Sequence, residues 1–419
     1  METGSAVRVL CRSTALVLAL SSFPLLLADW PGWRGPQRDG RSPEALPEKL
    51  PAEPKPLWKL SIGHGYSGAV TLGDTLVYVD DSQGSETAHV IDRTTGKERW
   101  KVPYAKSWSD EFEPGPRCTP QIDGERLYVQ SAQGIVACLS LADGKQLWSL
   151  DFKDLGMTWA ADRQSNIGAA VRRGHTGSPI VDGDRLFLQT SALNGRSIIA
   201  VDKRTGKQLW QALDDHTAYS SPVVATLAGR RQFVTATVQG LVGLDVASGG
   251  LLWRTSFQTG ANRNVLTPVI LGDDVLFASH TTGLRCQSIS ASGGNFASEQ
   301  RWLVRNLNIN MSTPVVVGDW GFGLGPARNF VCFETKSGKV AWDEPGFGAV
   351  ANVIADASHL LVQLDSGEVR ILKASPQAYT EVARFQASGK TYSHPAYHGG
   401  VLYVRDPLSL TAWPLVPKP

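Results

Sequence analysis

The chain has almost no excess of charge of either sign. Its 419 residues include 41 Lys and Arg against 39 Asp and Glu, which gives a formal net charge of +2 at pH 7. The sequence also lacks any long run of like charges. Nucleic acids and anionic membrane surfaces attract proteins through clustered basic side chains. The composition therefore favours neither of these partners.

Motifs for catalysis and metal binding are missing as well. The 8 His and 5 Cys form no His-Glu-x-x-His or Cys-x-x-Cys pattern. Carboxylates are adjacent at Asp80-Asp81 and at Asp214-Asp215, but neighbours on a loop need not converge on a substrate. We therefore expect no metal and no cofactor. A hydrolase or lyase whose acid and base come from distant parts of the chain remains an open alternative, because linear motifs do not reveal it.

The one long apolar run lies at the N-terminus. Arg8 and Arg12 precede an apolar stretch from Thr14 to Ala28, and Ala28 offers a small residue at a cleavage point. Residues 1–28 are therefore predicted to be a signal peptide, and an uncleaved membrane anchor is the alternative. Cys11 precedes the apolar run, so it cannot be the acylated cysteine of a lipoprotein. We expect an exported protein, periplasmic or extracellular, that is soluble, without an integral membrane span after cleavage, and not a lipoprotein.

Cysteine is scarce in the predicted mature chain. Export would permit disulfides, yet three of the four remaining cysteines occupy equivalent small-residue positions of a repeat described below. We therefore predict free, buried thiols, with a disulfide framework as the alternative, at Cys118, Cys138, Cys286 and Cys332.

A short repeat organises the rest of the sequence. Asp202 stands eight residues before Trp210, with Thr205-Gly206-Lys207 between them. A carboxylate that bonds backbone N–H groups, followed by a glycine with positive φ, is typical of a tight turn between two strands. The same spacing recurs, with Ser or Glu replacing Asp in two cases, at Asp92–Trp100, Ser140–Trp148, Asp245–Trp253 and Glu334–Trp342. Such recurrence indicates a repeat architecture.

The repeat predicts an all-β fold, an eight-bladed β-propeller of four-stranded blades. Eight segments have the small or polar residue, often with proline, that opens an inner strand. Eight aromatic residues are predicted to dock outer strands between blades: Trp58, Trp100, Trp148, Trp210, Trp253, Trp302, Trp342 and Phe385. The last unit lacks a fourth strand, and the strand around Trp58 has no unit before it. We expect this N-terminal strand to close the ring, which leaves no open edge. The domains are then 1–28, a Trp- and Pro-rich extension at 29–56, and the propeller at 57–419.

Asp followed by a Thr-Gly-Lys-like turn and Trp resembles the tryptophan-docking repeat of PQQ-like, quinoprotein-type propellers. This family includes pyrroloquinoline-quinone (PQQ) dehydrogenases and the non-catalytic BamB-like proteins of outer-membrane assembly. The lead-in Trp30…Trp33-Arg34-Gly35-Pro36 is similar to that of exported PQQ-repeat proteins. The resemblance implies PQQ and calcium for the dehydrogenases, which carry an adjacent Cys-Cys pair that is missing here. The leading hypothesis is therefore a BamB-like scaffold, and a quinone- or metal-dependent oxidoreductase is the alternative.

The longest spacing between successive docking aromatics marks a candidate binding site. It reaches 62 residues where 43 is common, and the excess falls in the inter-blade loop from Lys153 to Gly174. Loops of this kind converge on one mouth of the central channel. Five other loops and Tyr392 are predicted to reach the same mouth: His64–Tyr66, Asp110–Glu113, Asp214–His216, Thr259–Asn264 and Asn306–Asn310.

Tryptophan and arginine in an extended loop are typical of protein interfaces. We therefore expect a monomer that binds a protein or polymer at the mouth. The candidate partner-binding residues are Trp159, Arg163, Asn166, Arg172, Arg173 and Arg263.

Overall fold

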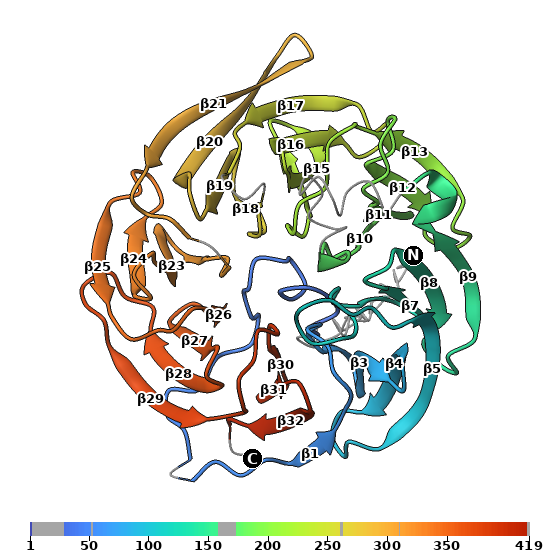
Figure 1. Cartoon of the computed structure of the whole chain (residues 1–419). Coiled ribbons are helices and arrows are strands. Elements are labelled where there is room, and N and C mark those ends of the chain that lie inside the picture. Colours follow the sequence, from blue (N-terminus) through green and yellow to red (C-terminus); the bar gives the residue numbers. More distant parts are fainter. Residues whose placement is uncertain (2–28, 52, 158–172, 260–262, 310, 417–419) are drawn as a thin grey trace.

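The computed structural model describes Met1 and residues 29–51, 53–157, 173–259, 263–309 and 311–416. Eight four-stranded antiparallel sheets stand around a central channel (Figure 1), so the predicted eight-bladed propeller is confirmed. A short 3-10 helix, η1 (Phe152–Leu155), follows the second blade. Within the described part of the chain, no helix has both the length and the apolar character that a membrane crossing requires.

Blades 1 to 7 each run from an inner strand to an outer strand in sequence order. Blade 1 comprises β2 (Val70–Leu72), β3 (Thr75–Ser82), β4 (Ser85–Asp92) and β5 (Glu98–Lys106), and blade 2 comprises β6 (Gln121–Asp123), β7 (Arg126–Gln130), β8 (Ile135–Ser140) and β9 (Gln146–Asp151). Blade 3 comprises β10 (Ile180–Asp182), β11 (Arg185–Gln189), β12 (Ile198–Asp202) and β13 (Gln208–Ala212). Blade 4 comprises β14 (Val223–Leu227), β15 (Arg230–Thr237), β16 (Gly240–Asp245) and β17 (Leu251–Ser256). Blade 5 comprises β18 (Val269–Leu271), β19 (Asp274–Ser279), β20 (Gly283–Ser292) and β21 (Asn295–Val304). Blade 6 comprises β22 (Val315–Val317), β23 (Trp320–Leu324), β24 (Phe330–Glu334) and β25 (Val340–Glu344). Blade 7 comprises β26 (Ala351–Ala355), β27 (His359–Leu364), β28 (Glu368–Lys373) and β29 (Glu381–Gln386).

Blade 8 is completed by the N-terminal strand, as predicted. It comprises β30 (Ala396–His398), β31 (Val401–Arg405) and β32 (Ser409–Pro414), and β1 (Trp58–Ser61) is its outer strand. β1 pairs antiparallel with β32, with Trp58 opposite Ala412. The first and last parts of the propeller therefore share one sheet, and this sheet closes the ring.

The repeated turn connects each blade to the one before it. Asp202 Oδ1 accepts hydrogen bonds from the backbone N–H groups of Arg204 and Thr205, and Gly206 has φ 72°. Trp148 of the preceding blade lies against this turn and donates from Nε1 to the Lys203 carbonyl (3.1 Å). A Cβ at Gly206 would stand 2.8 Å from the Trp148 ring. The glycine therefore supplies both the left-handed backbone and the space for the indole.

The same contact recurs around the ring. Trp58 of blade 8 donates to the Arg93 carbonyl of blade 1 (3.0 Å), which extends the pattern across the point of closure. Four further indoles donate to the turn of the following blade: Trp100 to Leu141, Trp210 to Val246, Trp302 to Thr335 and Trp342 to Ser375. Between blades 7 and 8 the direction is reversed, since Trp413 donates to the Ala387 carbonyl while its ring packs on Phe385.

Small residues face the docking tryptophans across the third and fourth strands. The partners opposite Trp148, Trp302 and Trp342 are Cys138, Cys286 and Cys332, respectively. Together with Cys118 they are free and buried in the structure, which agrees with the predicted unpaired thiols. Gly243 fills the equivalent position opposite Trp253, and a Cβ there would lie 2.2 Å from the indole Nε1.

Blade 5 departs from the repeat, and its neighbour adapts. β20 and β21 form a long hairpin with Gly293 and Gly294 at its tip, and this hairpin projects beyond the ring in Figure 1. Without a tight turn to receive it, the Trp253 indole donates instead to Gln232 Oε1 within its own blade (2.6 Å).

The N-terminal extension occupies the channel, which the sequence did not predict. Residues 29–46, drawn in blue inside the ring of Figure 1, contact all eight blades. Eight representative contacts, one to each blade, are Trp30 with Thr71, Pro31 with Ile122, Arg38 with Ser178 and with Pro222, Trp33 with Thr267, Arg34 with Pro314, Ser42 with Ala355, and Glu44 with Gly399. We call this segment the plug.

Two arginines anchor the plug in the channel interior. Arg38 is 4% exposed and donates to the carbonyls of Ser178 (3.2 Å), Pro222 (3.1 Å) and Pro179. Burial lowers the pKa of Arg38 to about 9. Arg34 is 2% exposed and donates to the Pro314 carbonyl (2.9 Å). The guanidinium groups thus receive backbone carbonyls in place of the water that burial removes.

Candidate functional site

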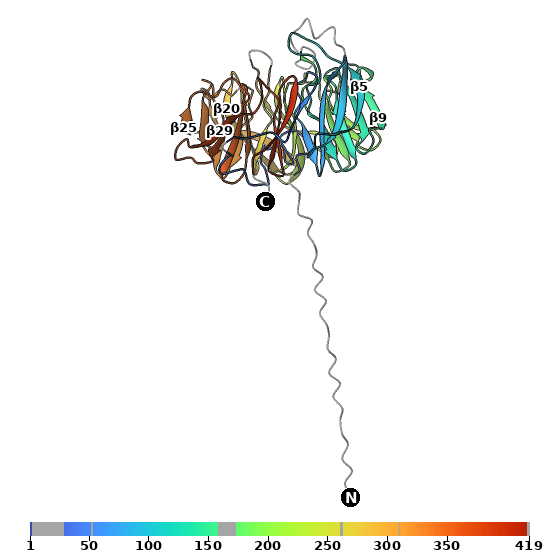
Figure 2. The same ribbon diagram turned by 90° about the horizontal axis from the view of Figure 1, so that it is seen from below.

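One face of the ring carries the loops that join the outer strand of each blade to the inner strand of the next. We call it the mouth face; it is the upper side of the ring in Figure 2. The plug enters from the opposite face, where Asp29 accepts from the Gly73 amide and Glu44 from the Gly399 and Gly400 amides. The plug therefore lies inside the ring, and its two ends are held at the face opposite the mouth face.

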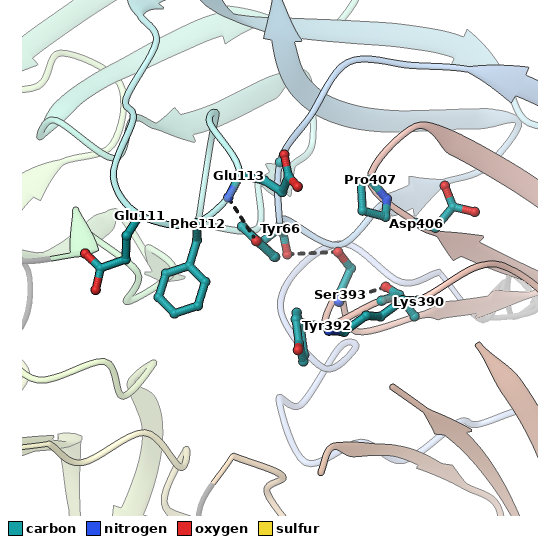
Figure 3. A pocket seen from close by; sticks show the side chains of 11 residues that line it. Tyr66, Glu111, Phe112, Glu113, Lys390, Tyr392, Ser393, Asp406 and Pro407 are labelled. Atoms are coloured by element: carbon teal, nitrogen blue, oxygen red, sulfur yellow. Dashed lines mark hydrogen bonds between the residues drawn. The ribbon is translucent and has the colours of Figure 1, made fainter. Parts of the chain in front are cut away.

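A cavity of about 360 Å³ lies on the mouth face between blades 8, 1 and 2. Figure 3 shows that three loops and the β31–β32 turn enclose it. Its lining includes three aromatic and three acidic side chains together with Lys390: Tyr66, Phe112, Tyr392, Glu111, Glu113 and Asp406. We call this the aromatic pocket. Its volume falls within the usual range for sites that bind small molecules.

A cation lies over each of the three aromatic rings of the pocket. The Arg117 guanidinium stands 4.5 Å from the Tyr66 ring centre, and Lys390 Nζ stands 5.5 Å from that of Tyr392. Arg173 stands 4.5 Å from the ring of Phe112. Cation–π contacts of this kind favour a fixed ring orientation. The aromatic walls are therefore held in place before any ligand arrives.

The acidic side chains of the pocket also have partners. Arg173 forms an ion pair with Glu111 (2.5 Å), and His64 Nδ1 lies 3.0 Å from Glu113 Oε2. Arg117 donates to Asp110 Oδ1 (3.1 Å) directly behind the pocket. The Glu113 amide donates to the Tyr66 hydroxyl (3.2 Å), which connects two of the loops. Opposite charges therefore alternate along this rim.

The candidate partner-binding residues divide into described and undescribed ones. Trp159, Arg163, Asn166 and Arg172 lie outside the described residues. Arg173 contacts Glu111 and Phe112, so it brings the end of the predicted insertion to the aromatic pocket. Arg263 belongs to another part of the mouth face, where its backbone N–H donates to Thr259 Oγ1 (2.7 Å). Arg173 and Arg263 thus lie in separate groups of contacts.

The part of the mouth face formed by blade 5 is basic. Burial and the nearby charge of Arg263 lower the pKa of His280 below its usual value. Burial and the charge of Arg305 lower the pKa of Arg285, whose guanidinium stacks on Phe257 at 4.2 Å. An anionic group placed here would relieve the mutual repulsion of these cations.

Large apolar side chains are exposed on the mouth face. Phe112 is 54% exposed and Leu408 is 58% exposed, and both lie beside the aromatic pocket. Leu193, in the β11–β12 connection, is 37% exposed, and Met311, before β22, is 43% exposed. Other exposed apolar residues, Leu209 and Leu251 among them, lie on the outer strands, so those of the mouth face are single positions on different blades and not one continuous patch. The sequence reasoning missed Leu193, Met311 and Leu408, because exposure cannot be deduced from residue type.

The described residues offer little for catalysis. Among them, no group of three or more His, Cys, Asp and Glu side chains could hold a metal ion. His89 lies 3.0 Å from both Asp80 and Glu98 and 3.3 Å from Ser82, a grouping that resembles a hydrolytic triad. Asp80 and His89 are buried, however, and the Tyr78 ring stacks on His89 at 4.5 Å. This cluster therefore stabilises the core of blade 1 and does not face a substrate.

Comparison with known proteins places the chain in a family. The family model of the outer membrane protein assembly factor BamB matches residues 51–166 and 105–344. BamB of Burkholderia pseudomallei (strain K96243) is 26% identical over 317 residues, which are 72% of each chain. BamB of Moranella endobia (strain PCIT) is 22% identical over 251 residues, and the chain spans only 59% of that protein's length.

A solved structure agrees with this result. The crystal structure of BamB from Moraxella catarrhalis has a TM-score of 0.60 and 15% identity, and it covers 86% of this chain and 98% of that one. At this identity the likeness concerns the fold. The family model, by contrast, matches more than half of the sequence. The chain therefore belongs to the PQQ-like propeller family of the outer membrane protein assembly factor BamB, as its docking repeat predicted.

Proposed function

We propose that this protein is an exported, non-catalytic propeller that acts as a scaffold and binds a protein or polymer partner across its mouth face. The observation that carries the proposal is the exposure of Leu193 and Met311 on loops of the mouth face. The relatives are named as assembly factors of the outer membrane, which supports a protein as the partner. We further propose a soluble monomer, periplasmic or extracellular and not a lipoprotein, that works without a bound cofactor.

The charges of the mouth face suggest which partner surface fits. Arg263, Arg285 and Arg305 belong to blade 5 and the loops beside it, and Arg305 lies six residues before Met311 in the chain. Arginine pairs with carboxylates through two parallel hydrogen bonds and also stacks on aromatic rings. A partner segment with apolar and acidic residues would satisfy both features of this surface. Buried apolar anchors would supply most of the affinity, and the rim charges would orient the partner.

Site-specific photocrosslinking in the native host tests the proposal. A crosslinking residue at Leu193 or Met311 is expected to trap one defined partner, whereas one at Leu209 is expected to trap none. Leu209 is a matched control because it is 48% exposed but lies on the outer strand β13. Equal trapping at all three positions, or none at any, would refute binding through the mouth face.

Charge reversal gives a second measurement. The double variant R163E/R172E is expected to lose the trapped partner at an unchanged melting temperature, because these side chains are proposed to touch the partner. Arg173 is left in place, because it pairs with Glu111 and stacks on Phe112. Retention of the partner would place the interface elsewhere on the ring.

An absorption spectrum and metal analysis of the purified protein accompany these tests. A quinone chromophore or stoichiometric calcium would instead support the oxidoreductase alternative.

A further inference from the structure

The aromatic pocket has a composition that the scaffold function does not require. Tyr66, Phe112 and Tyr392 come from three loops that are far apart in the sequence, yet their side chains surround one cavity (Figure 3). The Tyr66 and Tyr392 ring centres lie 6.0 Å apart with a tilt of 38°. A cation lies over each ring, so each ring has a contact that fixes its position in the lining. Such a cavity offers flat apolar surfaces with polar groups between them.

The charges of the pocket argue against a charged ligand. Glu111 is paired with Arg173 and Glu113 lies beside His64, while Lys390 lies over the Tyr392 ring. Asp406 accepts from the Gly389 amide (3.0 Å) and from the Ser409 hydroxyl (2.8 Å). An anionic ligand would meet the three carboxylates of the lining, and a cationic ligand would compete with Arg173 for Glu111 and with Lys390 for the Tyr392 ring. The balance of charges thus favours an uncharged ligand.

The same groups suit a ligand that carries many hydroxyls. Each carboxylate can accept several hydrogen bonds and has lone pairs left after pairing with one cation, and a lysine ammonium has three donors. The slightly positive C–H groups of a sugar ring are attracted to the negative face of an aromatic ring. Alternating aromatic faces and paired charges therefore match the alternating apolar faces and hydroxyl edges of a sugar chain.

We propose that the aromatic pocket is a binding site for an uncharged oligosaccharide, which stacks on Tyr66, Phe112 and Tyr392 and bonds through its hydroxyls to Glu113 and Lys390. The site is independent of the partner surface at Leu193 and Met311, which lie on blades 3 and 6. Failure of one proposal leaves the other standing, because photocrosslinking reads partner contact and the following titration reads sugar binding.

Titration calorimetry of the purified protein tests the site with defined probes. Cellohexaose, maltohexaose and hexa-N-acetylchitohexaose serve as uncharged probes, and heptalysine and heptaglutamate as charged ones. At least one hexasaccharide is expected to bind with a Kd of about 1 mM or lower, the range of a weak specific contact. If no hexasaccharide binds at about 5 mM, or if only a charged peptide binds, the proposal is wrong.

Variants locate the binding. Tyr392→Ala is expected to weaken sugar binding about tenfold, because one lost aromatic contact corresponds to about 1.4 kcal/mol. Tyr392→Phe keeps the ring and is expected to bind within about threefold of the wild type. Phe296→Ala is the matched control, since Phe296 is a partly exposed aromatic on β21, outside the pocket. Equal binding by the Tyr392→Ala variant and the wild type would refute the site even if a sugar binds. The melting temperature of each variant verifies that it is folded.

Discussion

Glu86 makes the stability of the propeller depend on pH above neutrality. Its side chain is fully buried on β4, accepts from the Tyr104 hydroxyl (3.0 Å), and accepts from the Ala132 amide of blade 2 (3.1 Å). Burial raises the pKa of this carboxyl to about 8, well above its ordinary value of 4.5. The native state therefore holds a proton at neutral pH that the unfolded chain has already released.

The sign and size of the effect follow from this difference in bound protons. Between about pH 4.5 and 8 the native state binds more protons than the unfolded state, so the free energy of unfolding falls as pH rises. The slope is about 1.4 kcal/mol per pH unit for one proton. From pH 6.5 to pH 8 the expected loss is therefore about 2 kcal/mol. Above the native pKa, both states are ionised and the loss levels off.

Urea denaturation followed by tryptophan fluorescence measures the effect in wild type and in Glu86→Gln. Glutamine keeps an acceptor for the Ala132 amide but does not titrate. The difference between the two free energies of unfolding is expected to change by about 2 kcal/mol between pH 6.5 and pH 8, in favour of the variant. Parallel pH profiles in this range would show that Glu86 is already ionised in the native state and would refute the reasoning.

The acidic side of the profile has a different origin. Burial lowers the pKa of His175 and of His394 to about 3. Each stays neutral in the native state while the unfolded chain binds a proton below about pH 6.5, so stability falls as pH decreases from 6.5 towards 3. Wild type and Glu86→Gln share this loss. The comparison between them above pH 6.5 is therefore free of it.

Three further predictions concern the repeat and its closure. Gly243→Ala is expected to lower the free energy of unfolding by about 1–3 kcal/mol, because its Cβ would overlap the Trp253 indole; Gly250→Ala, whose Cβ would meet only the Ser248 hydroxyl at 3.3 Å, is the control and should stay within about 0.5 kcal/mol in the same urea titration. Deletion of residues 29–60 removes β1 and the plug, so an aggregating or cold-labile product is expected; a truncated protein that melts like the mature one would contradict the closure described above. Thiol titration of the unfolded, non-reduced mature chain should find four reactive cysteines, which are Cys118, Cys138, Cys286 and Cys332. The native protein should react slowly, because all four thiols are buried. A count of two or none in the unfolded chain would show that disulfides are present.

The fold could be predicted because its rule is local. Asp202, Gly206 and Trp210 lie within one hairpin, and each has a physical task that only a few residue types perform: bonding the turn, adopting positive φ, and docking on the next blade. Repetition then gave the number of blades. The N-terminal closure followed by counting, since a ring of four-stranded blades cannot leave Trp58 without a sheet.

The site could be predicted only in part, because its contacts join distant loops. Topology brought His64–Tyr66, Asp110–Glu113 and Tyr392 to one mouth, and the structure confirms that they meet there. The stacking of Arg117 on Tyr66 depends on side-chain directions that no periodic pattern encodes. Partner binding by the arginines of the Lys153–Gly174 insertion stays a prediction, because most of that loop lies outside the described residues.

The sequence of the plug contains a signal for burial that the blade repeat does not explain. Trp30, Trp33, Arg34 and Arg38 lie in an irregular stretch rich in Gly and Pro, which cannot bury two indoles by itself. Two of these residues, Arg34 and Arg38, adopt positive φ values of 57° and 59°, a backbone that costs about 1 kcal/mol or more for a non-glycine residue. Such strain persists only where surrounding contacts fix it. The segment had to be received by another part of the fold, and the channel is the place that all blades share.

This arrangement changes how the blades depend on one another. In repeat proteins each unit contacts its neighbours alone, so that damage to one interface remains local. The plug here contacts all eight blades, and Arg38 by itself joins blades 3 and 4 through the carbonyls of Ser178 and Pro222. Each blade is therefore coupled both to the next one through its docking tryptophan and to a common centre. The interface proposed for the mouth face would rest on this centre, which would let loops from separate blades present one fixed surface to a partner.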